Sequence, residues 1–483
     1  MSVDVQTATD PTAAEEVSHL RGAVVGAVAG AAGGLVFGAS MAVTGMLPTI
    51  ASIVRTDSEL AGFGVHMVFA VLIGAVFGLL VVRLRLRVRE MLFWGQAYGA
   101  LWWFLGPQTL LLLFRGLPVD WGTPGAGALL PSLIGHLFYG TTTALALVLH
   151  QHDRRTTWRV PPAGAVLRGA VAGIAAATVL LWVPASPRDT LAWLLTGIAV
   201  GACYPLLFSA RLEPTGPALA RGTLYGFAAW VVVDLTLRPL AADGGLAWSQ
   251  PDAAAAAGHL PGYLLLGVGT AVGTTWLGLW ARELFLDDVR KIDSRPPGAR
   301  GPRAVAFGTL SGLGGGLLFT VVMVLVGALP LVANVVGADG APAGLVVHLV
   351  ISAVIGVSYA VLFRRQSFDV LSGIGWGVSY GFFWWVLGDL TLLPALTGAP
   401  IVWDAATLAA EFPSLVGHLA YGAALGGVYY RLEAGVDPWW MTRSDLEAAR
   451  VAARREQVLS AAPAIWALTT VLAVTLPILL SGA

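Results

Sequence analysis

Four histidines stand at matching positions in two distant parts of the chain. His66 and His136 lie in the first part, and His348 and His418 follow them at a constant offset of 282 residues. A neutral imidazole nitrogen binds haem iron, copper or zinc, and the ring also exchanges a proton near neutral pH. We therefore expect two paired sites, His66 with His136 and His348 with His418, for a cofactor, a metal or a proton.

The histidines belong to a longer internal repeat. Residues 48–136 correspond to residues 330–418 without an insertion, which indicates that one unit was duplicated. The further matched residues are Pro48 and Pro330, Tyr98 and Tyr380, Trp102-Trp103 and Trp384-Trp385, and Trp121 and Trp403. Features that both copies retain are the first place to look for function.

The composition indicates a membrane protein made of helices. Hydrophobic residues make up 57% of the chain, charged residues make up 12%, and the mean hydropathy is +0.76. Apolar stretches of about 20 residues match a hydrocarbon core about 30 Å thick. We expect membrane-spanning helices near 22–48, 63–82, 91–114, 131–150, 166–184, 189–209, 219–240, 260–281, 304–330, 343–363, 371–394, 413–430 and 462–481. Glycines at every fourth residue, from Gly22 to Gly38, predict close helix packing.

The basic residues predict the orientation in a cell or inner membrane. Apart from Arg55, Arg115, Arg188 and Arg238, the Lys and Arg residues fall on one side, which the positive-inside rule makes cytoplasmic. The N-terminus is then inside, the C-terminus is outside, and residues 1–20 form a disordered cytoplasmic tail. The basic clusters are Arg83 to Arg89, Arg154 to Arg159, Arg282 to Arg303, and Arg364-Arg365. A formal net charge of zero argues against nucleic-acid binding, and the single cysteine, Cys203, excludes a disulfide framework.

A middle unit completes the series but lacks the histidines. Subtracting 155 from the third copy places Tyr225, Trp230, Asp234, Thr236, Pro239 and Trp248 on Tyr380, Trp385, Asp389, Thr391, Pro394 and Trp403. The same subtraction places Trp193 and Tyr263 where His348 and His418 stand. The sequence therefore predicts that the middle unit, residues 166–285, keeps the scaffold and is functionally inert.

The expected fold is an all-α polytopic membrane protein with three tandem parallel four-helix repeats, residues 21–155, 166–285 and 304–433. An even number of helices makes each repeat begin on the same side, so we expect a pseudo-threefold axis normal to the membrane. A thirteenth helix near 462–481 is expected at the periphery. Residues 437–458 are predicted to form a cytoplasmic amphipathic helix, with Trp439 and Trp440 at the headgroups. This helix is a candidate docking site for another membrane or redox subunit.

Helix direction places the candidate residues at one depth. The second and fourth helices of each complete unit run inward and carry their histidines a few residues after their start, about 5 to 10 Å below the outer interface. The third helix returns to this layer with Gln108, with Asp234 beside Arg238 at i+4, and with Asp389, which lacks such a partner. Ionisable groups within a span usually face a protein interior or a wet cavity. We expect Asp389, Asp234, Gln108, Tyr98 and Tyr380 to line a substrate or proton path, and His150, His152 and His259 to be ordinary surface residues.

Paired histidines on the second and fourth helices suit a b-type haem, which needs one imidazole on each face of its ring. Small residues must then give the ring clearance, and Gly95, Gly99, Gly106, Gly377, Gly381 and Gly388 are candidates. The arrangement resembles the four-helix haem bundle of respiratory cytochrome b in helix order and histidine placement, not in sequence. This chain has one histidine per helix rather than two. The resemblance implies at most one haem per unit, for electron transfer.

Three other functions fit the same residues. A proton-coupled transporter or channel would use the outer layer of His and Asp side chains, and Pro107, Pro239 and Pro394 are candidate helix breaks. A transition-metal site could be built from the imidazoles together with Asp389. A membrane assembly subunit would carry no chemistry of its own. The sequence does not decide whether the protein is an enzyme.

Overall fold

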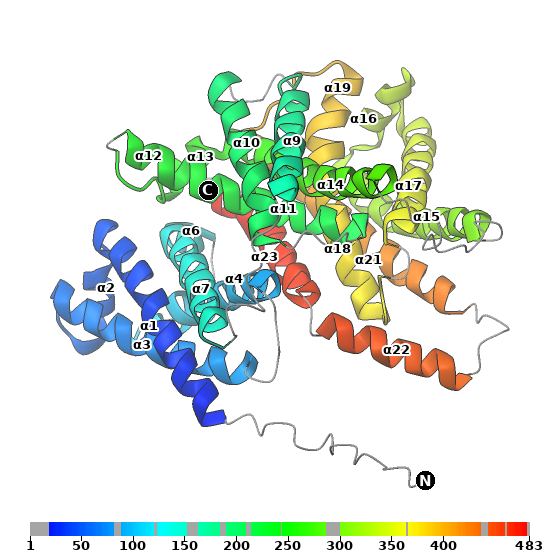
Figure 1. The fold of residues 1–483 in the computed structure, drawn as a ribbon. Helices are drawn as coiled ribbons and strands as arrows, with labels where there is room; N and C mark the ends of the chain where they lie inside the picture. Colours follow the sequence, from blue (N-terminus) through cyan, green and yellow to red (C-terminus); the bar gives the residue numbers. More distant parts are fainter. Residues whose placement is uncertain are drawn as a thin grey trace, which may run out of the picture.

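The computed structural model describes residues 19–81, 88–119, 123–151, 163–183, 190–208, 214–242, 244–285, 300–363, 366–435, 443–458 and 461–480. Within these ranges every regular element is a helix. Among the described residues, twelve helices are long and apolar enough to cross a membrane, one fewer than the thirteen spans expected from the sequence. Figure 1 shows three groups of helices around a single helix near the centre. We call these groups the first unit (residues 19–151), the middle unit (163–285) and the third unit (300–435).

The first and third units contain the same order of long and short helices, and the middle unit has the same four long helices among its described residues. The first unit consists of α1 (His19–Val43), α2 (Leu47–Ala51), η1 (Ser52–Val54), α3 (Glu59–Val81), α4 (Val88–Leu105), η2 (Gly106–Leu110), α5 (Leu111–Phe114), α6 (Thr123–Ala128) and α7 (Leu130–Gln151). The middle unit consists of α9 (Ala163–Leu180), α10 (Thr190–Leu207), α11 (Thr215–Val232), η3 (Val233–Leu237), α12 (Arg238–Ala241), α13 (Gln250–Ala255), η4 (Ala257–His259) and α14 (Leu260–Phe285). The third unit consists of α15 (Arg300–Val326), α16 (Leu329–Ala333), η6 (Asn334–Val336), α17 (Ala341–Phe363), α18 (Val370–Trp384), η7 (Trp385–Leu392), α19 (Leu393–Thr397), α20 (Ala405–Ala410) and α21 (Phe412–Ala434).

Each unit is built from the same three helix pairings. The first long helix packs against the second, as α1 does on α3, α9 on α10 and α15 on α17. The third packs against the fourth, as α4 does on α7, α11 on α14 and α18 on α21. The first long helix also packs against the fourth in all three units. Each unit is therefore two helical hairpins joined through their first and fourth helices.

Glycine lets the helix backbones touch within these hairpins. In α1 and α3, a Cβ atom added to Gly30 or to Gly74 would collide with the backbone of the other helix. Lipid chains are as apolar as the side chains they contact, so close backbone packing is a main source of helix association in a bilayer. The glycine spacing is thus a packing device, as the sequence indicated.

Gly74→Val is expected to lower the free energy of unfolding by about 1–3 kcal/mol or more, because the new side chain has to separate α1 from α3. Gly64→Val is the matched control, since Gly64 lies on the exposed face of α3 and its added Cβ meets no atom within 4 Å. Unfolding in mixed micelles of increasing SDS fraction, followed by tryptophan fluorescence, measures both variants. Equal midpoints for the two would contradict this account of the packing.

The third long helix of each unit contains a π-helical segment, namely η2, η3 and η7. In each segment a threonine hydroxyl donates to the carbonyl five residues earlier: Thr109 to Phe104, Thr236 to Val231 and Thr391 to Val386, at 2.8–2.9 Å. Pro107 lies inside its segment, whereas Pro239 and Pro394 follow theirs. The prolines therefore accompany a widened turn in a continuous helix, and such turns are frequent at functional sites.

One of the expected spans differs from the prediction. Helix α21 occupies the predicted span 413–430, but it is not among the twelve that are apolar enough to cross a membrane by composition. It carries tyrosines, glycines and a histidine because much of it packs against α18 and α15. The C-terminal helix α23 (Ala462–Leu480) does belong to the twelve.

The expectation that the C-terminal helix is peripheral is wrong. Helix α23 lies at the centre of Figure 1 and contacts equivalent elements of all three units. These contacts are with α4 and α6, with α11 and α13, and with α18 and α20. Leu468, Leu472, Ala473 and Leu479 of α23 are almost completely buried. Helix α23 therefore joins the three units as a common core.

Several expected segments lie outside the described residues. They include nearly all of the N-terminal tail, the basic cluster Arg83 to Arg87, the cluster Arg154 to Arg159, Arg364-Arg365, Trp121, His152, and Trp439-Trp440. The segment expected over 437–458 contains the helix α22 (Arg443–Val458), many of whose side chains are exposed. A hydrogen bond from the Gln457 amide to the Gln366 carbonyl ties the end of α22 to the third unit.

Candidate functional site

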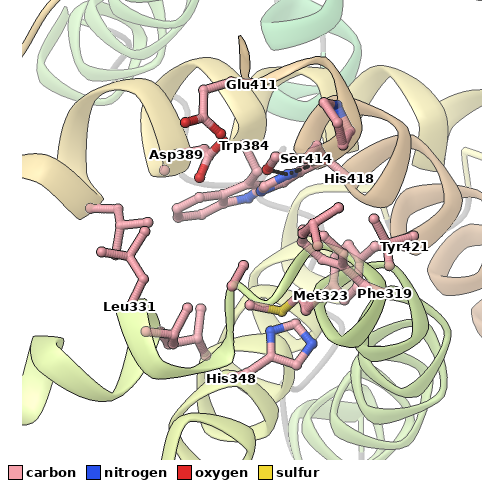
Figure 2. A pocket seen from close by; sticks show the side chains of 18 of the residues that line it. Phe319, Met323, Leu331, His348, Trp384, Asp389, Glu411, Ser414, His418 and Tyr421 are labelled. Atoms are coloured by element: carbon pink, nitrogen blue, oxygen red, sulfur yellow. Dashed lines mark hydrogen bonds between the residues drawn. The ribbon is translucent and has the colours of Figure 1, made fainter. Parts of the chain in front are cut away.

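The third unit contains a cavity of about 550 Å³ between its two hairpins. Most of its wall is apolar and comes from α15, α16, α17 and α19, with Met323 and Leu331 among the lining residues. Polar side chains come from the π-helical segment η7, the start of α21 and the middle of α17. Figure 2 shows Asp389 and Glu411 at one end of the cavity and His348 at the other. The volume is in the range of sites that hold a drug-sized molecule.

Asp389 and Glu411 form a carboxyl pair at the cavity. Asp389 projects from η7, and Glu411 is the residue immediately before α21. One oxygen of the Asp389 carboxyl, Oδ2, is buried and has no hydrogen-bond partner. Burial and the neighbouring charge of Asp389 raise the pKa of the Glu411 carboxyl to about 7. Glu411 therefore changes its charge near neutral pH, beside a buried acceptor that is not satisfied.

Each of the four candidate histidines makes its own hydrogen bond to a backbone carbonyl. Nε2 of His66 donates to the Gly34 carbonyl, and Nε2 of His348 donates to the Gly316 carbonyl, both at 2.9 Å. Nδ1 of His136 donates to the Ser132 carbonyl at 2.7 Å, and Nδ1 of His418 to the Ser414 carbonyl at 3.0 Å. Since a carbonyl only accepts, these bonds fix the tautomer and occupy one nitrogen of each ring.

A phenylalanine ring lies against both histidines of each pair. The Phe37 ring centre is 5.2 Å from that of His66 and 4.8 Å from that of His136. Phe319 lies 5.3 Å from His348 and 4.7 Å from His418. A haem needs the space between its two axial imidazoles, and here a side chain packs edge-on against both rings. The residues present therefore do not fit a haem between the members of either pair.

Four of the six glycines expected to give a haem clearance serve helix packing instead. Cβ atoms added to Gly95, Gly99, Gly377 or Gly381 would collide with the backbone of the fourth helix. Among the described residues, no three or more His, Cys, Asp or Glu side chains are grouped so that they could hold a metal ion. The phenylalanine ring against both imidazoles thus leaves neither pair the geometry that the haem hypothesis requires.

The middle unit shows what the histidine of the second helix contributes to the fold. The indole Nε1 of Trp193 donates to the Ala177 carbonyl at 3.2 Å. Ala177 occupies the place of Gly34 and Gly316, because Gly169 and Gly173 precede it in α9 as Gly308 and Gly312 precede Gly316 in α15. Tryptophan and histidine thus make the same bond between the first and second helices. We conclude that His66 and His348 hold their hairpins together.

Asp234 of the middle unit is fully partnered. Its carboxylate accepts from the Arg238 guanidinium at 2.9 Å, as the i, i+4 spacing predicts. It also pairs with Nδ1 of His259 at 2.7 Å and accepts from the Tyr263 hydroxyl at 3.0 Å. The expectation that His259 is an ordinary surface residue is therefore wrong. The chain between the two residues folds back so that His259 lies beside Asp234, and the spacing of the two residues in the sequence does not show this contact.

The remaining predicted site residues lie away from the cavity. The Tyr98 hydroxyl donates to the Ile73 carbonyl at 2.8 Å, and the Tyr380 hydroxyl shares a hydrogen bond with Ser358 at 2.7 Å, so both tie the third helix to the second. Gln108 is buried, and its Nε2 atom has no partner. Of the tandem tryptophans, Trp385 donates to the Glu411 carbonyl at 3.2 Å, whereas Trp384 lines the cavity.

The sequence comparison of the two complete units missed Glu411 because that comparison sought residues they share. Glu411 corresponds to Leu129 in the first unit and to Ala256 in the middle unit. Asp389 likewise corresponds to Pro107 in the first unit. A search for polar residues that one copy has gained would have found Glu411. The chain as a whole matches no known protein family, no curated protein and no solved structure.

Proposed function

We propose that the protein is a membrane carrier that binds a small solute in the cavity of the third unit and exchanges it for a proton at Asp389 and Glu411. The observation that carries the proposal is the buried, unpartnered Oδ2 atom of Asp389 at a cavity of about 550 Å³. A buried polar atom without a partner costs about 1–3 kcal/mol. At the wall of a cavity, a bound solute can supply the missing hydrogen-bond donor.

The carboxyl pair gives a physical route to proton coupling. Two neighbouring carboxyl groups in a poorly hydrated place do not readily hold two negative charges, so they retain a proton until a cation or a hydrogen-bond donor replaces it. The raised pKa of Glu411 places this exchange near neutral pH. Loading of the solute would release a proton, and unloading would take one up.

The same proposal covers the architecture. We infer that the three units are parallel copies of one four-helix module arranged around α23, because the helix pairings recur in all three. The basic loops favour a cytoplasmic N-terminus, and the cavity then opens nearer the outer side. The first and middle units provide scaffold, and the third unit carries the site.

Access to the cavity from both sides of the membrane tests the carrier proposal without knowledge of the solute. Ser352 lines the cavity from α17, is almost fully buried, and its replacement by cysteine is nearly isosteric. In a Cys203→Ser background, Ser352→Cys is expected to react with a membrane-impermeant thiosulfonate both in right-side-out and in inverted vesicles. Mass spectrometry of the protein after labelling reads the result.

Ser311→Cys is the matched control, because Ser311 is buried in α15 but does not line the cavity. It is expected to stay unlabelled from either side. Labelling of Ser352→Cys from one side alone would leave a binding site but contradict a carrier. No labelling from either side would overturn the proposed function altogether.

A further inference from the structure

The middle and third units contain the same carboxylate in two different surroundings. Asp234 and Asp389 occupy the same place in η3 and η7, two residues before the threonines that bond five residues back. The preceding Trp230 and Trp385 also make equivalent bonds, to the Ala256 and Glu411 carbonyls at 3.1 and 3.2 Å. The two units therefore differ in what surrounds the carboxylate rather than in how it is held.

The side chains that pair with the carboxylate are present in one unit and missing in the other. The Arg238 guanidinium and the His259 imidazole bind Asp234, whereas Leu393 and Ser414 take their places in the third unit. Both replacements line the cavity. Glu411 adds a second acid where the middle unit has Ala256. Among the described residues that line the cavity, none is a lysine or an arginine.

We propose that the cavity of the third unit takes an organic monocation, with a guanidinium or ammonium group on an apolar body, whose charge occupies the place that Arg238 and His259 fill in the middle unit. This inference rests on the proposed function and names the solute class of the same site. The cationic group satisfies the free oxygen of Asp389 and the ionised Glu411. The Trp384 indole also lines the cavity and offers a cation–π surface.

The apolar part of the ligand follows from the rest of the wall. Val322, Met323 and Val332 line the cavity away from the acids, so a body without further charges fits there. Leu331 and Leu396, which also line it, are strongly exposed on the outside of the unit. In a membrane these two side chains face lipid, so the cavity is accessible to an amphiphilic molecule from the bilayer.

Binding of benzylguanidinium and of benzylurea separates charge from shape, because the two probes are nearly isosteric and only the first is a cation. The protein is reconstituted into nanodiscs, and equilibrium dialysis is corrected with empty nanodiscs. We expect benzylguanidinium to bind at least about tenfold more tightly than benzylurea. Asp389→Asn is expected to remove this preference. Asp339→Asn, an exposed carboxylate in the loop before α17, is the control and is expected to retain it.

A second variant places the carboxylate partners of the middle unit in the third. Leu393→Arg combined with Ser414→His copies the partners of Asp234, an arrangement that already folds in this chain. We expect the double variant to unfold at or above the temperature of the original protein and to lose at least about tenfold in benzylguanidinium affinity. Undiminished affinity in this variant, or equal affinity of the original protein for the two probes, would overturn the inference.

The cation could be a free solute or the amine headgroup of a lipid, and the same assay distinguishes them. Nanodiscs of phosphatidylglycerol alone are compared with nanodiscs that also contain phosphatidylethanolamine. Competition by the amine lipid, seen as weaker benzylguanidinium binding, supports a lipid headgroup, and unchanged binding supports a free solute. If Ser352→Cys is labelled from both sides but benzylurea binds as well as benzylguanidinium, the inference fails and the carrier proposal stands.

Discussion

Glu411→Gln is expected to abolish the pH dependence of cation binding in the third unit. The pKa of Glu411 is raised to about 7 by burial and by Asp389, so Glu411 is mostly neutral at pH 6 and mostly charged at pH 8. A cation that binds only when Glu411 is ionised must displace its proton. One linked proton with this pKa makes benzylguanidinium binding about tenfold tighter at pH 8 than at pH 6.

The other titratable groups that line the cavity are Asp389 from η7, His348 from α17, and His418 and Tyr421 from α21. One nitrogen of each imidazole already donates to a carbonyl, and the Tyr421 hydroxyl donates to the Ser352 carbonyl at 2.8 Å. Glu411→Gln keeps the shape of the side chain and should give a flat affinity profile. Asp339→Asn should retain the tenfold change. If the affinity of Glu411→Gln for benzylguanidinium changes with pH as steeply as that of the original protein, the exchanged proton belongs to another group.

Removal of residues 461–483 is expected to prevent the three units from forming one stable particle. Helix α23 contacts α4, α11 and α18, and these are the third helices of the three units. Without it, the buried faces of all three would have to meet lipid or one another. We expect loss of the monodisperse peak in size-exclusion chromatography after detergent extraction, and loss of benzylguanidinium binding with it.

A point variant tests the same contact without a deletion. Ala473 is completely buried on α23, whereas Ala467 is exposed on the same helix. Ala473→Leu should lower the free energy of unfolding by about 1–3 kcal/mol, because the larger side chain does not fit between the units. Ala467→Leu should have little effect. A stable, monodisperse protein that lacks residues 461–483 would show that α23 is dispensable to the core.

Much of the helical layout could be predicted from the sequence, and the place of α23 could not. Hydropathy identifies segments that avoid water. It does not distinguish a helix that faces lipid from a helix buried in protein, because both surroundings are apolar. The span 462–481 therefore looked the same whether it faced lipid or three other helices. Helix α21 is the opposite case, since its many protein contacts allow polar residues and make it less apolar than a lipid-facing span.

The sequence predicted the parts of the candidate site that can be read from single residues and their near neighbours in the chain. It did not predict the contacts between residues that are distant in the sequence. The absence of an i+4 cation beside Asp389 is visible in the sequence, and the structure places Asp389 at the cavity. The matching histidines were also visible, but their partners were not, because the Gly34 and Gly316 carbonyls belong to another helix. His259 and Glu411 were missed because each reaches an aspartate more than twenty residues earlier in the chain.

The central helix follows all three units in the sequence, and this order constrains how the protein is made. Domains are generally completed from the N-terminus during synthesis, so all three units enter the membrane before α23 leaves the ribosome. Until then the inner faces of the units lack their common partner. A nascent chain halted at residue 460 would carry the helices of all three units without the helix that joins them. Assembly of the common core therefore follows the synthesis of all three units, and it gives cellular quality control a late event that separates molecules with α23 in place from those without it.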